Sequence, residues 1–264
     1  MTRAYEASSV GDVGFDVAGE AYDRFMGRYS RPLALRFADF LEVEAGQHAL
    51  DVGCGPGALT EPLVARLGAT HVAAIDPSQP FVEACRERFP GVDVRLGAAE
   101  SLPFADGVHD VAAACLVVHF MTDPVGGLSE MKRVTRRDGW VGATVWDLGN
   151  NRAPMRPIWE AMAEVAPDHP GERDFPVGSR AGLVAVLEGA GLRHVECEEM
   201  VVTVAHPTFE EWWEPFLHGV GPVGEALAAL GDGGRDRLEA ALRRRLGPGP
   251  FELDAVSYAA RGRA

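Results

Sequence analysis

The stretch HALDVGCGPGALT, residues 48–60, decides the fold class of this chain. Its apolar half ends in Asp51, its glycines stand at positions 53, 55 and 57, and apolar residues at helical spacing follow. A strand, a glycine-rich turn and a helix in this order form the first half of a nucleotide-binding α/β unit. Because glycine has no Cβ, the turn can approach a ligand closely, while the helix start directs free N–H groups toward it.

A second acidic residue, Asp76, ends the next apolar run, about 20 residues after Gly55. A carboxylate at this place can accept both hydroxyls of a ribose. Gly53, Gly55 and Ala58 also fit the G-x-G-x-x-G/A pattern of dinucleotide-binding proteins. A nicotinamide-dependent oxidoreductase is therefore one function that this stretch leaves open.

The D-x-G-x-G-x-G arrangement of residues 51–57 resembles motif I of the class I S-adenosylmethionine-dependent methyltransferases. A carboxylate at Asp51 suits a ligand whose near end is an ammonium group rather than a pyrophosphate. Other segments follow the order and spacing of the ubiquinone/menaquinone-type methyltransferases, the type 11 group, over about residues 20–146. These segments are YDRFMGRYS (22–30), Asp76, GAAESLPF (97–104) and RVTRRDG (133–139).

The resemblance implies an α/β fold of the Rossmann-like class I methyltransferase type. Such a fold has a seven-stranded, mainly parallel sheet with an antiparallel last strand, helices on both faces and helical lid inserts. We expect an N-terminal arm and lid helix over residues 1–45 and a cofactor-binding core over 46–146. Residues 147–264 would complete the sheet and carry substrate-capping inserts at about 147–178 and 207–248.

Three further runs predict strands. The continuous apolar run from Asp110 to Val118 is typical of a central parallel strand that is buried on both faces. Residues 195–205 alternate between apolar and polar, as in an exposed strand, and residues 251–260 read as the last strand. The N-terminal helix is expected over residues 20–43.

The resemblance also implies S-adenosyl-L-methionine as the cofactor and S-adenosyl-L-homocysteine as the product. The residues expected to bind the cofactor are Tyr22, Arg28, Asp51, Gly53, Gly55, Asp76, Pro77, Ala99, Glu100 and Leu116. Tyr22 and Arg28 would close over the methionine end, although their helix could instead pack on the sheet edge. Relatives carry an adenine-binding Asp where this chain has Ala98, so adenine recognition would rest on the Ala99 N–H, assisted by Glu100.

Composition restricts the partners of this chain. The net charge of −14 argues against a nucleic acid, because phosphate binding needs clustered positive charge. The four cysteines form no CxxC pair and have no metal-like spacing with histidine, so we expect no metal and a reducing cytoplasm. No apolar run is long enough to span a membrane. A monomer and a homodimer both remain open.

Transfer of a methyl group from a sulfonium ion needs alignment and exclusion of water rather than a metal or a covalent nucleophile. His119, just after the central strand, is the best candidate for a general base, and its alternative is a residue of the pocket wall. Trp146 and Asp147 end the fifth strand, where one of them could face the substrate, and Asp147 is the second catalytic candidate. Trp212 and Trp213 could line an acceptor pocket but fit the core of a lid better, and His206 is expected at the surface.

The favoured function is a methyltransferase that modifies an O, N or C nucleophile of a small apolar or aromatic molecule. The oxidoreductase alternative is weakened because one large group of those enzymes needs a Tyr-x-x-x-Lys pair. Lys132 is the single lysine, and Leu128 stands four positions before it. A third alternative is a methyltransferase-like scaffold that binds the cofactor or a partner without turnover, which the unusual Ala98 keeps open.

Overall fold

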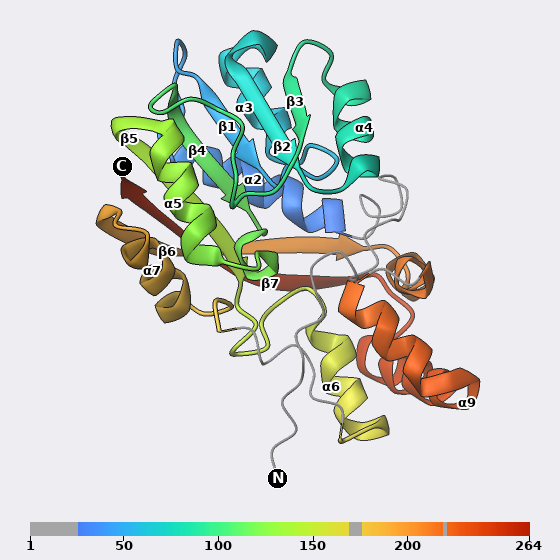
Figure 1. Ribbon diagram of the computed structural model, residues 1–264. Coiled ribbons are helices and arrows are strands. Elements are labelled where there is room, and N and C mark those ends of the chain that lie inside the picture. The colour runs from blue at the N-terminus through green and yellow to red at the C-terminus, as the bar shows by residue number, and fades with distance from the viewer. Residues whose placement is uncertain (1–25, 169–175, 219–220) are drawn as a thin grey trace.

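The computed structural model describes residues 26–168, 176–218 and 221–264 (Figure 1). A single seven-stranded sheet runs through these residues, with the strand order β3-β2-β1-β4-β5-β7-β6. All neighbouring strands are parallel except that β7 runs antiparallel to both β5 and β6. The strands are β1 (Ala49–Val52), β2 (Val72–Asp76), β3 (Asp93–Leu96), β4 (His109–Cys115), β5 (Thr135–Trp146), β6 (Arg193–His206) and β7 (Phe251–Arg263). The predicted fold is thereby confirmed.

The central strand β4 is buried on both faces because its residues are small and apolar. Val111 and Ala113 face one core, whereas Ala112 and Ala114 face the other, and all four are fully buried. The strand is shorter than predicted. It ends at Cys115, because Leu116 adopts a positive φ of 63° that takes the chain out of the extended conformation.

Helices cover both faces of the sheet. One core is shared with α2 (Arg28–Phe40) and α3 (Thr60–Leu67), and the opposite core with α5 (Pro124–Val134) and α7 (Arg180–Gly189). The remaining helices are α4 (Gln79–Arg88), α6 (Arg156–Val165), α8 (Phe209–Trp213) and α9 (Gly221–Leu246). Of the helix predicted over residues 20–43, the described part begins at residue 26, and Tyr22 lies outside the described residues.

The helices of the two predicted inserts pack on each other. α6 belongs to the first insert and α9 to the second, and they contact each other below the sheet in Figure 1. The second predicted insert is helical in the structure. It contains α8, a 3-10 helix (Glu214–His218) and the long α9, which is kinked at Gly231 with a φ of 64°.

The order of the strands locates the ligand side of the sheet. The chain proceeds from β1 to β2 on one side, whereas β4 lies on the other side of β1. The carboxyl ends of β1 and β4 therefore form the switch point of the topology, where open α/β sheets bind ligands. The glycine-rich turn and the segment after Leu116 both start at this point.

Candidate functional site

The glycine-rich turn leaves β1 at Gly53, where a side chain has no room. A Cβ atom at Gly53 would lie 2.5 Å from Val117 Cγ1, and its φ of 71° also favours glycine. The N–H groups of Gly53 and Cys54 donate to the carbonyl of Ile75 at 2.7 and 3.1 Å, which fixes the turn against β2. At Gly55 the φ is 52°, but a Cβ there would meet no atom of the described residues within 4 Å. The turn therefore presents its backbone to open space at Gly55.

Asp76 joins the end of β2 to this turn. One carboxylate oxygen accepts the N–H of Gly55 and the other accepts the N–H of Ser78, both at 2.8 Å. The side chain is buried, and burial raises the pKa of Asp76 to about 6 although the two N–H groups lower it. Each oxygen keeps a lone pair, so hydroxyl groups can still bind it. Pro77, which follows, is exposed.

Asp51 lies beneath the turn with no exposed surface. Its Oδ2 accepts the Thr60 hydroxyl at 2.6 Å, whereas its Oδ1 has no hydrogen-bond partner among the described residues. Burial, reinforced by the nearby charge of Asp76, raises the pKa of Asp51 to about 7. A buried carboxylate oxygen without a partner is costly, and a cationic ligand would remove this cost.

The chain after β4 forms the other wall of the switch point. Leu116 has a φ of 63°, which is strained for a residue with a side chain, and its N–H donates to the Thr144 carbonyl at 3.1 Å. His119 lies in the 3-10 helix that follows (Val118–Phe120). Burial lowers the pKa of His119 to about 4, so its imidazole is neutral at physiological pH.

Comparison with known proteins identifies the family. A model of the methyltransferase domain, type 11, matches residues 50–142. Nocamycin O-methyltransferase from Saccharothrix syringae is 30% identical over 205 residues, which cover 70% of this chain and 72% of that protein. The chain belongs to the type 11 methyltransferase family. Several other curated relatives match only in part, since the chain spans 33%, 42% and 54% of their lengths.

Solved structures share the fold of this methyltransferase. YcgJ from Bacillus subtilis superposes with a TM-score of 0.56 at 17% identity, covering 89% of this chain and 97% of that one. Phosphoethanolamine N-methyltransferase 2 from Haemonchus contortus, solved with S-adenosylhomocysteine, gives a TM-score of 0.57 at 16% identity. That match covers 94% of this chain and 57% of the other chain. Because the chain belongs to the type 11 methyltransferase family, it is an S-adenosylmethionine-dependent methyltransferase. The oxidoreductase alternative is thereby excluded.

The loop that is predicted to bind adenine, residues 97–104, is held in place by hydrogen bonds to Glu100. Its Oε1 accepts the N–H groups of Thr122 and Asp123 at 3.0 and 3.3 Å, which ties the loop to the turn after His119. Ala99 is buried, whereas Ala98 is exposed. The adenine contacts of Ala99 and Glu100 stay a prediction.

The structure places the predicted lid residue Arg28 at the end of β6. Its Nη1 lies 2.8 Å from Glu211 Oε1 and donates to His206 Nδ1 at 3.0 Å, and Tyr29 Oη lies 2.9 Å from His206 Nε2. The expectation of a surface His206 is wrong, because this ring is fully buried. The guanidinium of Arg28 is thus held by β6 and α8, which favours packing over contact with the methionine end of the cofactor.

Asp147, the second predicted catalytic residue, lies inside a network of polar side chains. The side chain is fully buried and accepts hydrogen bonds from Asn150, Arg152 and Tyr258. These contacts tie Asp147 to the loop after β5 and to β7, and its catalytic role stays a prediction.

Two tests of other site types are negative. In the described part of the chain, no three His, Cys, Asp or Glu side chains come together in a way that could hold a metal ion. Within the same residues, each helix is too short or too polar to span a bilayer.

Trp212 and Trp213 are 2% and 3% exposed and pack on Phe209 and Phe216, as expected for the core of a lid.

Proposed function

We propose that this methyltransferase transfers a methyl group from S-adenosylmethionine to an O, N or C nucleophile of a small apolar or aromatic molecule. The observation that carries the choice of cofactor is the buried Oδ1 of Asp51, which has no hydrogen-bond partner among the described residues. Asp51 lies in the strand that leads into the glycine-rich turn, whose backbone is open at Gly55. An ammonium group fits this oxygen, whereas the pyrophosphate of a dinucleotide would be repelled by it.

The other residues of the switch point fit the same cofactor. Asp76 would bind the ribose hydroxyls through its remaining lone pairs, and Gly53 and Gly55 let the backbone approach the ligand. Pro77, Ala99, Glu100 and Leu116 would complete the binding surface. When bound, S-adenosylmethionine supplies a methyl group that is attached to a positively charged sulfur. The sulfur is the leaving group and becomes a neutral thioether.

The low pKa of His119 supports an acceptor that is itself acidic. A neutral imidazole with a pKa of about 4 can accept a hydrogen bond but is a weak base at neutral pH. An acidic phenol, an enol or a carboxylic acid ionises without a strong base, so His119 would only need to orient it. The O-methyltransferase activity in the name of the Saccharothrix relative agrees with an oxygen nucleophile.

A panel assay tests this proposal. The protein is incubated with S-adenosylmethionine and, one at a time, small phenols, enols, carboxylic acids and amines, and release of S-adenosylhomocysteine is measured. We expect turnover with acidic oxygen nucleophiles and little with amines that are protonated at neutral pH. Turnover restricted to such amines would contradict the inferred role of His119.

A further inference from the structure

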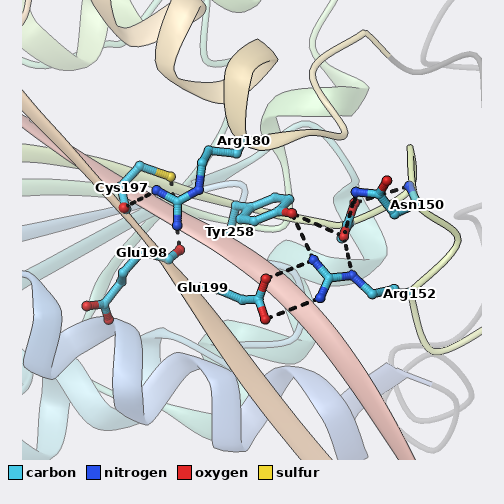
Figure 2. A network of polar contacts seen from close by, with 8 residues as sticks. Asn150, Arg152, Arg180, Cys197, Glu198, Glu199 and Tyr258 are labelled. Atoms are coloured by element: carbon cyan, nitrogen blue, oxygen red, sulfur yellow. Dashed lines mark hydrogen bonds and ion pairs between the residues drawn. The ribbon is translucent and has the colours of Figure 1, made fainter.

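Figure 2 shows a polar network that includes Asn150, Arg152 and Tyr258. These three residues all donate to the side chain of Asp147, the residue that follows β5. Its Oδ2 lies 2.5 Å from Arg152 Nε and accepts the Tyr258 hydroxyl at 3.2 Å. Its Oδ1 accepts the backbone and side-chain N–H groups of Asn150 at 3.2 and 2.9 Å. Arg152 continues the network to Glu199 on β6 with an Nη2–Oε2 distance of 2.8 Å. The loop after β5 and the strand β7 thus meet at one buried carboxylate, and Arg152 links this carboxylate to β6.

The backbone of the same loop is fixed to the last strand. The Asp147 N–H donates to the Val256 carbonyl at 2.9 Å, and the Val256 N–H donates to the Arg152 carbonyl at 2.8 Å. The Arg152 N–H closes the loop on the Asp147 carbonyl at 2.9 Å. Residues 147–152 therefore form a compact turn. Both backbone and side-chain hydrogen bonds attach this turn to β7.

This turn is also the base of the first insert. The N–H groups of Leu148 and Gly149 both donate to the carbonyl of Gly178, at 3.1 and 3.0 Å. Gly178 has no room for a side chain, because a Cβ atom there would lie 2.9 Å from Leu148 Cβ. The two ends of the insert are thereby clamped together directly beside Asp147. α6 lies between these ends and packs on α9 of the second insert.

We propose that Asp147 is a positioning residue that fixes the base of the 147–178 insert and, through α6, the surface that receives the methyl acceptor. The proposal rests on the proposed function and on the expectation from the sequence that the inserts cap the acceptor. Its hydrogen bonds reach residues 150, 152 and 258, none of which belongs to the cofactor-binding segments. Loss of the carboxylate should therefore impair acceptor binding and leave cofactor binding intact.

The variant Asp147→Asn tests this directly, because it keeps the size of the side chain but removes its charge. It also turns an amide N–H toward the donors of Arg152 and Tyr258. Asp254→Asn is the matched control: Asp254 lies on β7, is exposed, and accepts one hydrogen bond, from Thr203 Oγ1 at 2.6 Å. Tyr258→Phe is the milder second variant, since it removes one donor and keeps the ring.

Three measurements are made on the full chain. Hydrogen exchange of peptides within residues 148–165 should become roughly tenfold faster or more in Asp147→Asn, and remain unchanged in Asp254→Asn. Titration with S-adenosylhomocysteine should give the wild-type affinity in all variants. With the member of the acceptor panel that the wild type uses best, KM for the acceptor should rise about tenfold while kcat changes little.

The outcomes separate this proposal from the proposed function. Unchanged exchange in Asp147→Asn, or an equal loss of cofactor and acceptor affinity, would overturn the positioning role. A wild type that does not bind S-adenosylhomocysteine would overturn the proposed function, while the exchange experiment would still decide whether Asp147 holds the insert. If Asp147→Asn does not fold, Tyr258→Phe takes its place with the same expected directions and a smaller effect.

Discussion

Replacing Asp51 by asparagine should stabilise the protein without its cofactor and, at the same time, weaken cofactor binding. The side chain has no exposed surface, and its Oδ2 accepts the Thr60 hydroxyl. Burial raises the pKa of Asp51 from its ordinary value of 3.8 to about 7. Asparagine has nearly the same shape and can still accept from Thr60, but it carries no charge that must be buried.

The sign and size of the stability effect follow from the pKa of Asp51. Between about pH 4 and pH 7, the folded protein holds a proton on Asp51 that the unfolded chain has released. The wild type therefore loses stability as the pH rises through this range, and the loss is complete above about pH 7. At about 1.4 kcal/mol for each pKa unit, the loss is at most roughly 4 kcal/mol. The variant has no such loss, so its advantage should grow from about pH 4 to pH 7 and then stay constant.

Cofactor binding should change in the opposite direction. In the proposed complex, Asp51 Oδ1 accepts a charge-assisted hydrogen bond from the ammonium group of the cofactor. Loss of that bond should cost roughly 2–3 kcal/mol, or about 30- to 150-fold in Kd. Removing a buried charge that binds a ligand commonly makes the protein more stable and its ligand binding weaker.

Urea unfolding without ligand at pH 5 and pH 8, combined with calorimetric titration with S-adenosylhomocysteine, measures both effects. Asp254→Asn is the control, because it removes an exposed carboxylate of the same sheet. A variant that is less stable than the wild type at pH 8 would refute the burial argument. A variant with unchanged affinity for S-adenosylhomocysteine would refute the ammonium contact.

Three further changes test the rest of the site. Asp76→Ala should weaken S-adenosylhomocysteine binding by roughly 2–4 kcal/mol, because it removes both the ribose contact and the hydrogen bond from the Gly55 N–H. Unchanged affinity in calorimetry would contradict the assignment of Asp76 to the ribose. His119→Gln should lower kcat without changing cofactor affinity, and the wild-type rate above about pH 5 should be independent of His119 ionisation, because its pKa is about 4. Gly55→Ala should lower the free energy of unfolding by about 1 kcal/mol, because alanine is disfavoured at the positive φ of this position. The free energy of cofactor binding should fall by much more, and equal losses of stability and of binding would show that the cofactor does not use the space at Gly55.

The parts of the site that are local in sequence could be predicted from it. The strand, the glycine turn and the helix after Asp51 are contiguous, and their spacing alone fixes where the carboxylate and the open backbone must lie. Asp76 could be predicted because the following parallel strand must end at the same edge of the sheet. The central strand was also predictable, since its small apolar residues suit burial on both faces, although its end at Cys115 depends on the backbone of Leu116.

The polar networks could not be predicted, because their members are distant in sequence. Tyr258 meets Asp147 across 111 positions, and His206 meets Tyr29 across 177. A single sequence carries no signal for such pairs, so Asp147 resembled a catalytic residue and His206 a surface residue. The burial of His206 and the hydrogen bonds of Asp147 follow only from the pairing of β6 and β7 with the rest of the sheet.

The measurement that tests the central claim most directly is calorimetric titration of the purified protein with S-adenosylhomocysteine and, in parallel, with NAD. The account predicts binding of S-adenosylhomocysteine with a Kd on the order of micromolar and no heat of binding with NAD. Binding of NAD with no response to S-adenosylhomocysteine would contradict it, because the unpartnered oxygen of Asp51 would then face a pyrophosphate rather than an ammonium group.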